Sequence, residues 1–228
     1  MFKSTDEEKH APSLVLASAS PRRRELLSRL GVPFEVRPVG ADEAHAPGET
    51  PWQHARRVAL LKLACARRTR ADEAVLVADT IVELDGVALG KPRSGEEAVR
   101  MLEALRGRSH AVHTAVAIGA QGIHATVVCT TQVTMRHYSD EDLHAYVATG
   151  EPLDKAGAYA IQDEHFAPVS QVHGSYSNVV GLPLAPTARL LRLVGYEVTS
   201  DDRYAIRLKA GDDGHLPHSQ HQHHAKER

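Results

Sequence analysis

Long hydrophobic runs, an excess of one charge and closely spaced cysteines are all missing from this chain of 228 residues. No segment approaches the ~20 consecutive apolar residues that a membrane-spanning helix needs, so we expect no contact with a membrane. The formal net charge is −2, which provides no general positive field for nucleic acid. Any cationic binding site must therefore be local.

Cysteine is scarce, and so are the marks of an exported protein. The two cysteines, Cys65 and Cys129, stand far apart and lack the spacing of a metal site. We expect both to be reduced and to act as small hydrophobic residues, which suits a reducing compartment. The charged stretch from Met1 to His10 has no apolar core, so it does not read as a secretory signal. We therefore expect a cytoplasmic protein.

The composition that is present is ordinary for a globular protein, with 42% hydrophobic and 25% charged residues. Strand-like and helix-like segments alternate, which favours the α/β class. The length permits one large domain or two lobes that share a cleft. We expect a flexible segment at 1–12, a folded domain at 13–209 and a disordered tail at 210–228. The tail carries histidines that could bind metal, but a solvated tail is the preferred alternative and we assign it no function. These histidines are His215, His218, His221, His223 and His224.

Helix caps and turn signals predict most of the elements. Thr50, Pro51 and Gln53 begin a helix that runs through Ala66. The apolar run 74–78 predicts a buried strand that ends at Asp79. A hairpin is expected between strands at 81–84 and 87–89. Further predicted elements are a helix from 94 to 107, strands at 111–119 and 123–135, a helix at 139–147 and a helix at 185–194.

The most informative stretch is LVLASASPRRRELL at 14–27. A short apolar strand leads into a turn and then into a helix, with Ser20 as the cap, Pro21 in the first position and Gly31 at the end. Serine hydroxyls, backbone N–H groups and arginines meet at the positive end of this helix. They predict an anion site, and phosphate is the obvious anion. The alternative is a surface helix whose arginines are only solvated.

Asp79 and Lys62 are the sharpest individual candidates. Ligands of open α/β sheets lie beyond the carboxyl ends of strands, where a carboxylate such as Asp79 can bind Mg²⁺ or accept a proton from water. An aspartate that caps a turn is the alternative. Lys62 falls in line with Ala55, Ala59 and Ala66 on the core face of its helix. A lysine there must meet an anion or extend to water.

Three loop segments complete the candidates. Lys91 in the sequence GKPR and Glu43 in an acidic pair say little alone. Gln162 ends the run DKAGAYAIQ, where small residues permit close backbone approach and the amide can both donate to and accept from a base. Several separate cationic elements around one carboxylate strand suit a triphosphate.

Together with GSYSNVVGLPL at 174–184, these motifs resemble those of the Maf family of nucleoside triphosphate pyrophosphatases, once described as septum-formation inhibitors. The resemblance covers about 14–195, and DKAGAY-x-IQ is its most specific part. It implies an elongated mixed sheet flanked by helices, with two lobes around a central cleft, similar to inosine triphosphate pyrophosphatases.

The resemblance also implies roles for single residues. Asp79 would be the general base that activates water. Thr80 and Gln162 would help to select the nucleobase of the substrate. Glu43 and Asp79 would hold Mg²⁺ or Mn²⁺. A homodimer is an expectation from the resemblance alone. The residues implied to bind the phosphates are Ser18, Arg22, Arg23, Lys62 and Lys91.

Some positions depart from the family pattern or divide its subfamilies. The subfamily that acts on methylated guanosine triphosphate has tryptophan where this chain has Arg22, so arginine points to the subfamily for dTTP and UTP. Ala160, Asp163 and His165 replace usual glycines and Pro168 replaces an aromatic residue, and these changes bear on substrate preference. We therefore predict a metal-dependent pyrophosphatase for dTTP and UTP. The alternatives are a pyrophosphatase for other or non-standard nucleotides, such as inosine triphosphate, and a non-catalytic nucleotide-binding regulator of cell division.

Overall fold

A seven-stranded mixed sheet forms the centre of the computed structural model, which describes residues 13–66, 68–120 and 122–198. The strand order is β2-β1-β3-β5-β6-β7, and β4 pairs with β3. β1 is parallel to β2 and β3, and the remaining pairs are antiparallel. The predicted α/β class and mixed sheet are confirmed. The expectations for 1–12 and for the histidine-rich tail lie outside the described residues.

Strands and helices alternate along the chain. The strands are β1 (Ser13–Leu16), β2 (Phe34–Val36), β3 (Glu73–Leu84), β4 (Val87–Leu89), β5 (Ser109–Ala120), β6 (Ile123–Met135) and β7 (Val169–His173). The helices are α1 (Pro21–Ser28), α2 (Pro51–Cys65), α3 (Gly95–Leu105), α4 (Asp140–Ala148), α5 (Tyr176–Val180) and α6 (Leu184–Leu193). Two short 3₁₀ helices, η1 (Glu151–Asp154) and η2 (Ala156–Ala158), follow α4.

The helices begin where their caps predict. Ser20 Oγ accepts a hydrogen bond from the third residue of α1 at 3.3 Å. The Thr50 N–H donates to Gln53 Oε1 at 2.9 Å and begins α2. Ser94 and Ser139 cap α3 and α4 in the same way as Ser20 caps α1. These caps satisfy N–H groups that have no partner within the helix.

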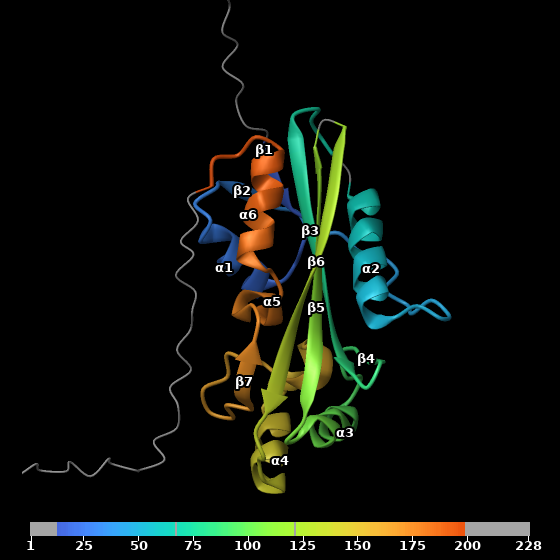
Figure 1. Ribbon diagram of the computed structural model, residues 1–228, viewed down its shortest axis with the longest axis vertical. Helices are drawn as coiled ribbons and strands as arrows, with labels where there is room; N and C mark the ends of the chain where they lie inside the picture. Colours follow the sequence, from blue (N-terminus) through green and yellow to red (C-terminus); the bar gives the residue numbers. More distant parts are fainter. Residues whose placement is uncertain (1–12, 67, 121, 199–228) are drawn as a thin grey trace, which may run out of the picture.

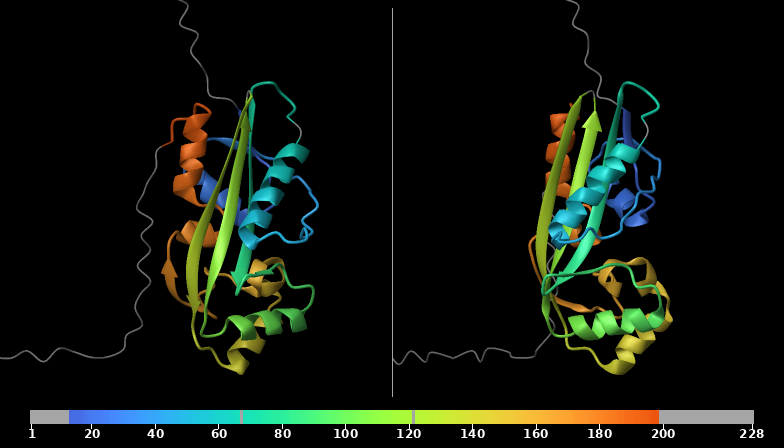
Figure 2. Two further views of the ribbon diagram at one scale, coloured as in Figure 1. Left: turned by 45° about the vertical axis from the view of Figure 1, so that its right-hand side comes forward. Right: turned by 90° about the vertical axis from the view of Figure 1, so that its right-hand side faces the viewer.

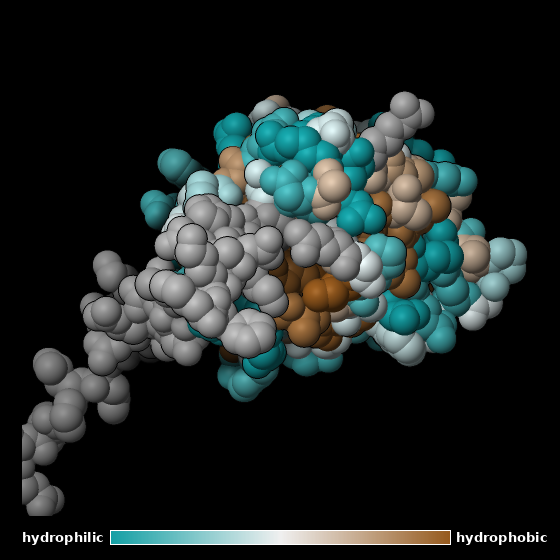
Figure 3. Space-filling model, turned by 90° about the horizontal axis from the view of Figure 1, so that it is seen from above, coloured by the Kyte–Doolittle hydropathy of each residue, from teal (hydrophilic) through white to brown (hydrophobic). Residues whose placement is uncertain are grey.

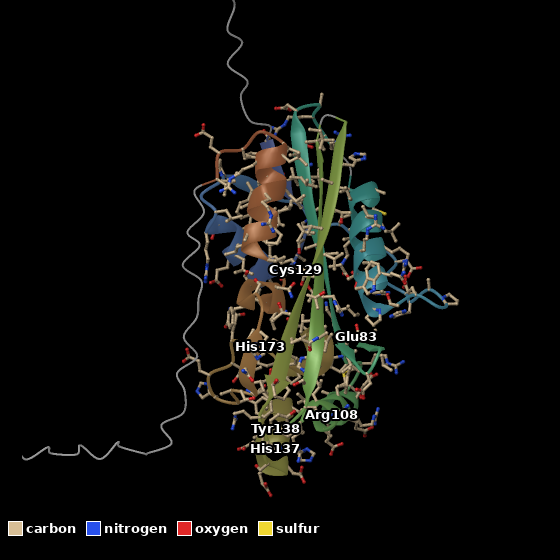
Figure 4. The ribbon with its side chains drawn as sticks, viewed as in Figure 1. Glu83, Arg108, Cys129, His137, Tyr138 and His173 are labelled. Carbon is tan, nitrogen blue, oxygen red and sulfur yellow. The ribbon has the colours of Figure 1, made fainter. Side chains whose placement is uncertain are left out.

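Helices cover both faces of the sheet, which Figure 1 shows edge-on. α2 packs on one face, and α1, α5 and α6 pack on the other. A third apolar cluster lies around α3 and α4 at the other end of the long strands, which forms a second lobe (Figure 2). Tyr138, labelled in Figure 4, belongs to this cluster, and its hydroxyl donates to the Leu102 carbonyl at 2.6 Å. The two lobes expected from the sequence are therefore present.

The surface agrees with a core enclosed by helices. Seen from above, much of the surface is hydrophilic, and hydrophobic residues show near the centre of the view and toward its right-hand side (Figure 3). Among the helices of the described residues, none combines the length and the apolar character needed to cross a membrane.

β3 differs from its prediction. The sequence predicts two strands interrupted at Asp79, but the structure has one continuous strand of 12 residues. The expectation that a strand ends at Asp79 is wrong, because β5 pairs with β3 through this region. Asp79 stands opposite Ala115, and Thr80 stands opposite Thr114.

The neighbouring strand β1 is the one that ends here. β1 pairs with β3 as far as Leu16 opposite Leu76. On the same edge, β4 pairs with β3 only from Val82 onward. Within the described residues, this edge of β3 therefore lacks a strand partner over 77–81, and the turn 17–20 lies beside it. We call this stretch the open edge of β3.

The first residue of β3 makes the stability of the fold depend on pH. Glu73 is fully buried, and hydrogen bonds from Arg37 and Thr69 lower its pKa from 4.5 to about 2. A depressed carboxyl pKa stabilises the folded state above the ordinary value, and this contribution is lost as the pH falls through the folded value. We expect the free energy of unfolding to decrease between pH 4.5 and about 2, and Glu73→Gln to flatten that decrease in urea titrations.

Glu35→Gln is the matched control, because Glu35 also bonds Arg37 but is exposed. Equal acid sensitivity of both variants and the wild type would show that Glu73 is not the source of the effect.

Candidate active site

Two cavities meet at the open edge of β3. The first is lined by Ser18, Arg22, Arg23, Glu43, Lys62 and Lys91, among others. The second is lined by Thr80, Val82, Tyr159, Ile161, Gln162 and Val180, among others. Arg22, Arg23, Lys91 and Asp154 line both, so the cavities adjoin. We call them the cationic cavity and the inner cavity.

The carboxylates of Asp79 and Glu43 converge on one ammonium group. Lys62 Nζ lies 2.8 Å from Asp79 Oδ1 and 2.7 Å from Glu43 Oε1. Lys62 belongs to the last turn of α2, and Glu43 comes from the loop between β2 and α2. Lys62 and Asp79 are only 8% and 6% exposed. Of the two alternatives for this core-facing lysine, contact with an anion is the one found.

Glu43 is held in its charged form by the cations around it. Burial raises the pKa of its carboxyl group, while the hydrogen bond and charge of Lys62 lower it. The charges of Lys91 and Arg23 act in the same direction as Lys62, so the pKa lies below its ordinary value. The cationic cavity thus contains a carboxylate that stays ionised at neutral pH.

Arg23 connects α1 to the open edge of β3. Its Nε donates to the Gly181 carbonyl at 2.9 Å, and its Nη2 donates to Thr80 Oγ1 at 3.1 Å. A longer contact of 3.5 Å runs from Nη1 to Ser18 Oγ. Burial lowers the pKa of the guanidinium, while the charges of Asp79 and Glu43 oppose that shift. Arg23 therefore ties α1 to β3 and to the end of α5.

Arg22 reaches across to the second lobe. Its Nη1 lies 3.4 Å from Asp154 Oδ2 at the end of η1. Asp154 also accepts from the buried Lys155 at 2.6 Å. Sequence reasoning missed Asp154, although it begins the DKAGAY motif, because its partner Arg22 lies 132 residues away in the chain.

Two tyrosines hold the segment that leads to Gln162. The Tyr159 hydroxyl contacts the buried His110 Nε2 at 2.7 Å, and the Tyr146 hydroxyl accepts from the Ala160 N–H at 3.1 Å. Between them, Ala158 has a φ of 61°, a left-handed conformation that residues other than glycine rarely adopt. The packing around this segment offsets that strain. Gln162 is thereby placed in the inner cavity.

The structure brings the predicted site residues together around the two cavities. Lys62, Glu43 and Asp79 are joined by ion pairs, and Ser18, Arg23 and Thr80 by hydrogen bonds. Gln162 lines the inner cavity with Thr80 and is not among the residues lining the cationic cavity. Arg22 and Lys91 lie where the two cavities adjoin.

The loop before α2 contains a group with metal-ligating atoms that the sequence did not suggest. One ligand atom each from His45, Glu49 and His54 lies within 4.8 Å of the others. Arg57, however, binds Glu49 through both Nε at 2.8 Å and Nη2 at 2.7 Å. A metal ion here would have to displace this guanidinium from the carboxylate.

Comparison with known proteins gives a consistent result. The family model described as "Maf-like protein" matches residues 13–194. A dTTP/UTP pyrophosphatase of Anaeromyxobacter dehalogenans (strain 2CP-1) is 53% identical over 190 residues, which cover 82% of this chain and 96% of the relative. The relative of the same name from Thermomicrobium roseum is 49% identical, with 85% and 89% covered. That from Moorella thermoacetica is also 49% identical, with 81% and 96% covered.

Arg23 makes two hydrogen bonds through its planar guanidinium group, so we predict that lysine cannot replace it. Arg23→Lys removes the paired contacts to Gly181 and Thr80, because an ammonium group lacks the planar donors. We expect the free energy of unfolding to fall by roughly 1–3 kcal/mol in urea titrations. Arg24→Lys, one residue along the same helix but exposed, should leave it unchanged. Equal free energies of unfolding for the two variants would contradict the stabilising role of the Arg23 contacts.

Proposed function

The chain belongs to the Maf family, and from this premise we propose that it is a nucleoside triphosphate pyrophosphatase that acts on dTTP and UTP. The named relatives share at least 49% of their aligned residues with it over at least 81% of the chain. The reaction converts the triphosphate and water into a nucleoside monophosphate and pyrophosphate.

One observation carries the proposal. The Asp79 carboxylate is held 2.8 Å from Lys62 Nζ, beside a cavity whose walls contribute Arg22, Arg23 and Lys91. A carboxylate next to several cations suits a reaction in which water must lose a proton while phosphate charge is neutralised. A protein that only bound nucleotides would have no need of this carboxylate beside the phosphates.

Asp79 is the general base in the proposed mechanism. Its carboxylate accepts a proton from water, and the water oxygen attacks the α-phosphorus. The bond from the α-phosphorus to the bridging oxygen breaks, and the electron pair leaves with pyrophosphate. Lys62 orients Asp79 for this step, because its ammonium group holds one carboxylate oxygen in place.

The remaining cations bind the phosphates. Arg22, Arg23 and Lys91 offer guanidinium and ammonium donors where the two cavities adjoin. Ser18 adds a hydroxyl group from the turn that follows β1. Such donors stabilise the negative charge that accumulates on the leaving pyrophosphate.

Glu43 and Asp79 fit a divalent cation such as Mg²⁺ or Mn²⁺. Both supply hard carboxylate oxygens, and each contacts Lys62 through one oxygen, which leaves the other oxygen free. The free oxygen of Asp79 has two lone pairs, one for the cation and one for the proton from water. When bound, the ion supplies further neutralisation of the phosphate charge. The group around Glu49 is less suitable, because Arg57 already binds that carboxylate.

The inner cavity would bind the nucleobase of the substrate. Thr80 and Gln162 provide polar groups, and Val82, Ile161 and Val180 provide apolar walls. Substrate sites of this kind combine apolar contact with a few placed polar groups.

The variant Asp79→Asn directly tests the role of Asp79 as the general base. We expect release of pyrophosphate from dTTP and UTP to fall by roughly 10²–10⁴-fold, because the amide cannot accept the proton from water. Binding of a non-hydrolysable dTTP analogue, followed by calorimetry, should persist. Asp72→Asn, an exposed aspartate just before β3, is the matched control and should retain full turnover.

The outcomes separate the remaining functions. Unchanged turnover in Asp79→Asn would remove this residue as the base. Wild-type turnover of inosine triphosphate in preference to dTTP and UTP would overturn the substrate assignment. Binding without turnover of any triphosphate would favour a nucleotide-binding regulator.

A further inference from the structure

A chain of hydrogen bonds runs behind the inner cavity. Thr114 Oγ1 donates to the Asn178 carbonyl at 2.9 Å. Thr80 Oγ1 lies 3.0 Å from Thr114 Oγ1, and Arg23 Nη2 donates to Thr80 Oγ1 at 3.1 Å. Thr114 is completely buried, whereas Thr80 is partly exposed and lines the cavity.

The two ends of this chain decide where each proton lies. A carbonyl oxygen can only accept, so the single proton of Thr114 is directed to Asn178. Thr114 then offers only an acceptor to Thr80, and the Thr80 proton is directed to Thr114. A guanidinium can only donate, so Arg23 takes a lone pair of Thr80 and supplies no acceptor. Toward the inner cavity, Thr80 therefore has a lone pair and no proton.

We propose that Thr114 and the Asn178 carbonyl make Thr80 a fixed hydrogen-bond acceptor that selects bases with an imino N–H. Uracil and thymine carry such a group at N3, whereas cytosine has a lone pair there. Cytosine would place one acceptor against another, which leaves both unpaired. The inference rests on the proposed function, since it assigns the base to the inner cavity. Thr114 is a positioning residue, because it acts through Thr80.

Gln162 cannot supply this selection alone. Its amide carries both a donor and an acceptor, and a rotation of the amide exchanges them. Selection therefore needs a second group beside Gln162 that can only accept a hydrogen bond. Both Thr80 and Gln162 line the inner cavity.

Thr114→Val tests the proposal. Valine has nearly the same shape but no hydroxyl, so the Thr80 proton is released and can turn toward cytosine. The Asn178 carbonyl keeps a partner, because it also accepts from the Gly181 N–H at 3.0 Å. We expect the ratio of kcat/KM for UTP to that for CTP to fall by roughly tenfold or more. This ratio does not depend on the fraction of active protein.

Two controls isolate the hydroxyl group. Thr114→Ser retains it and should keep the wild-type ratio. Thr126→Val makes the same change at a partly buried threonine of β6, whose hydroxyl donates to the Val116 carbonyl at 3.2 Å. It should also keep the wild-type ratio. Thr114→Ala is the second variant if valine prevents folding.

Dissociation constants of non-hydrolysable UTP and CTP analogues give the same comparison without turnover. A ratio that falls in Thr114→Val or Thr114→Ala, and not in the controls, supports the proposal. An unchanged ratio in the folded variants overturns it. Absence of wild-type turnover would contradict the proposed enzyme, whereas the binding ratio would still decide the role of Thr114.

Discussion

The difference in length between β1 and β3 is the constraint on which the site depends. β1 ends at Leu16, while β5 pairs with β3 through to Glu83 and keeps it extended. Successive side chains of a strand point to opposite faces, so Asp79 meets Lys62 of α2 whereas Thr80 meets Thr114 behind the inner cavity. In the proposed reaction, the residue that accepts the proton and the residue that contacts the nucleobase are therefore neighbours in the chain, Asp79 and Thr80.

Charge pairing makes this arrangement stable without substrate. A buried charge is costly unless it is paired and hydrogen-bonded. Lys62 is paired with two carboxylates, and Arg23 donates to groups of β3 and α5. Arg22 is the more adaptable partner, because its contact with the exposed Asp154 is long at 3.4 Å. In the proposed function, phosphate binding would replace this contact between the two lobes.

Features that depend on neighbouring residues could be predicted from the sequence, whereas contacts between distant residues could not. The caps at Ser20, Thr50 and Ser139 placed three helices, and the stripe of small residues placed Lys62 on the core face. The end of a strand at Asp79 was wrong, because polarity at one residue resembles a strand end and the pairing with β5 is invisible in the sequence. Asp154 and Thr114 were missed for the same reason, since their partners lie 132 and 64 residues away. The catalytic and metal-binding roles remain predictions.

Hydrolysis of dTTP in water labelled with a heavy oxygen isotope tests the central claim most directly. If Asp79 activates water for attack on the α-phosphorus, as proposed, the label will appear in the nucleoside monophosphate while pyrophosphate stays unlabelled. Mass spectrometry of both products distinguishes the two. Label in pyrophosphate, or release of single phosphates instead of pyrophosphate, would contradict the account, because water would then attack a different phosphorus.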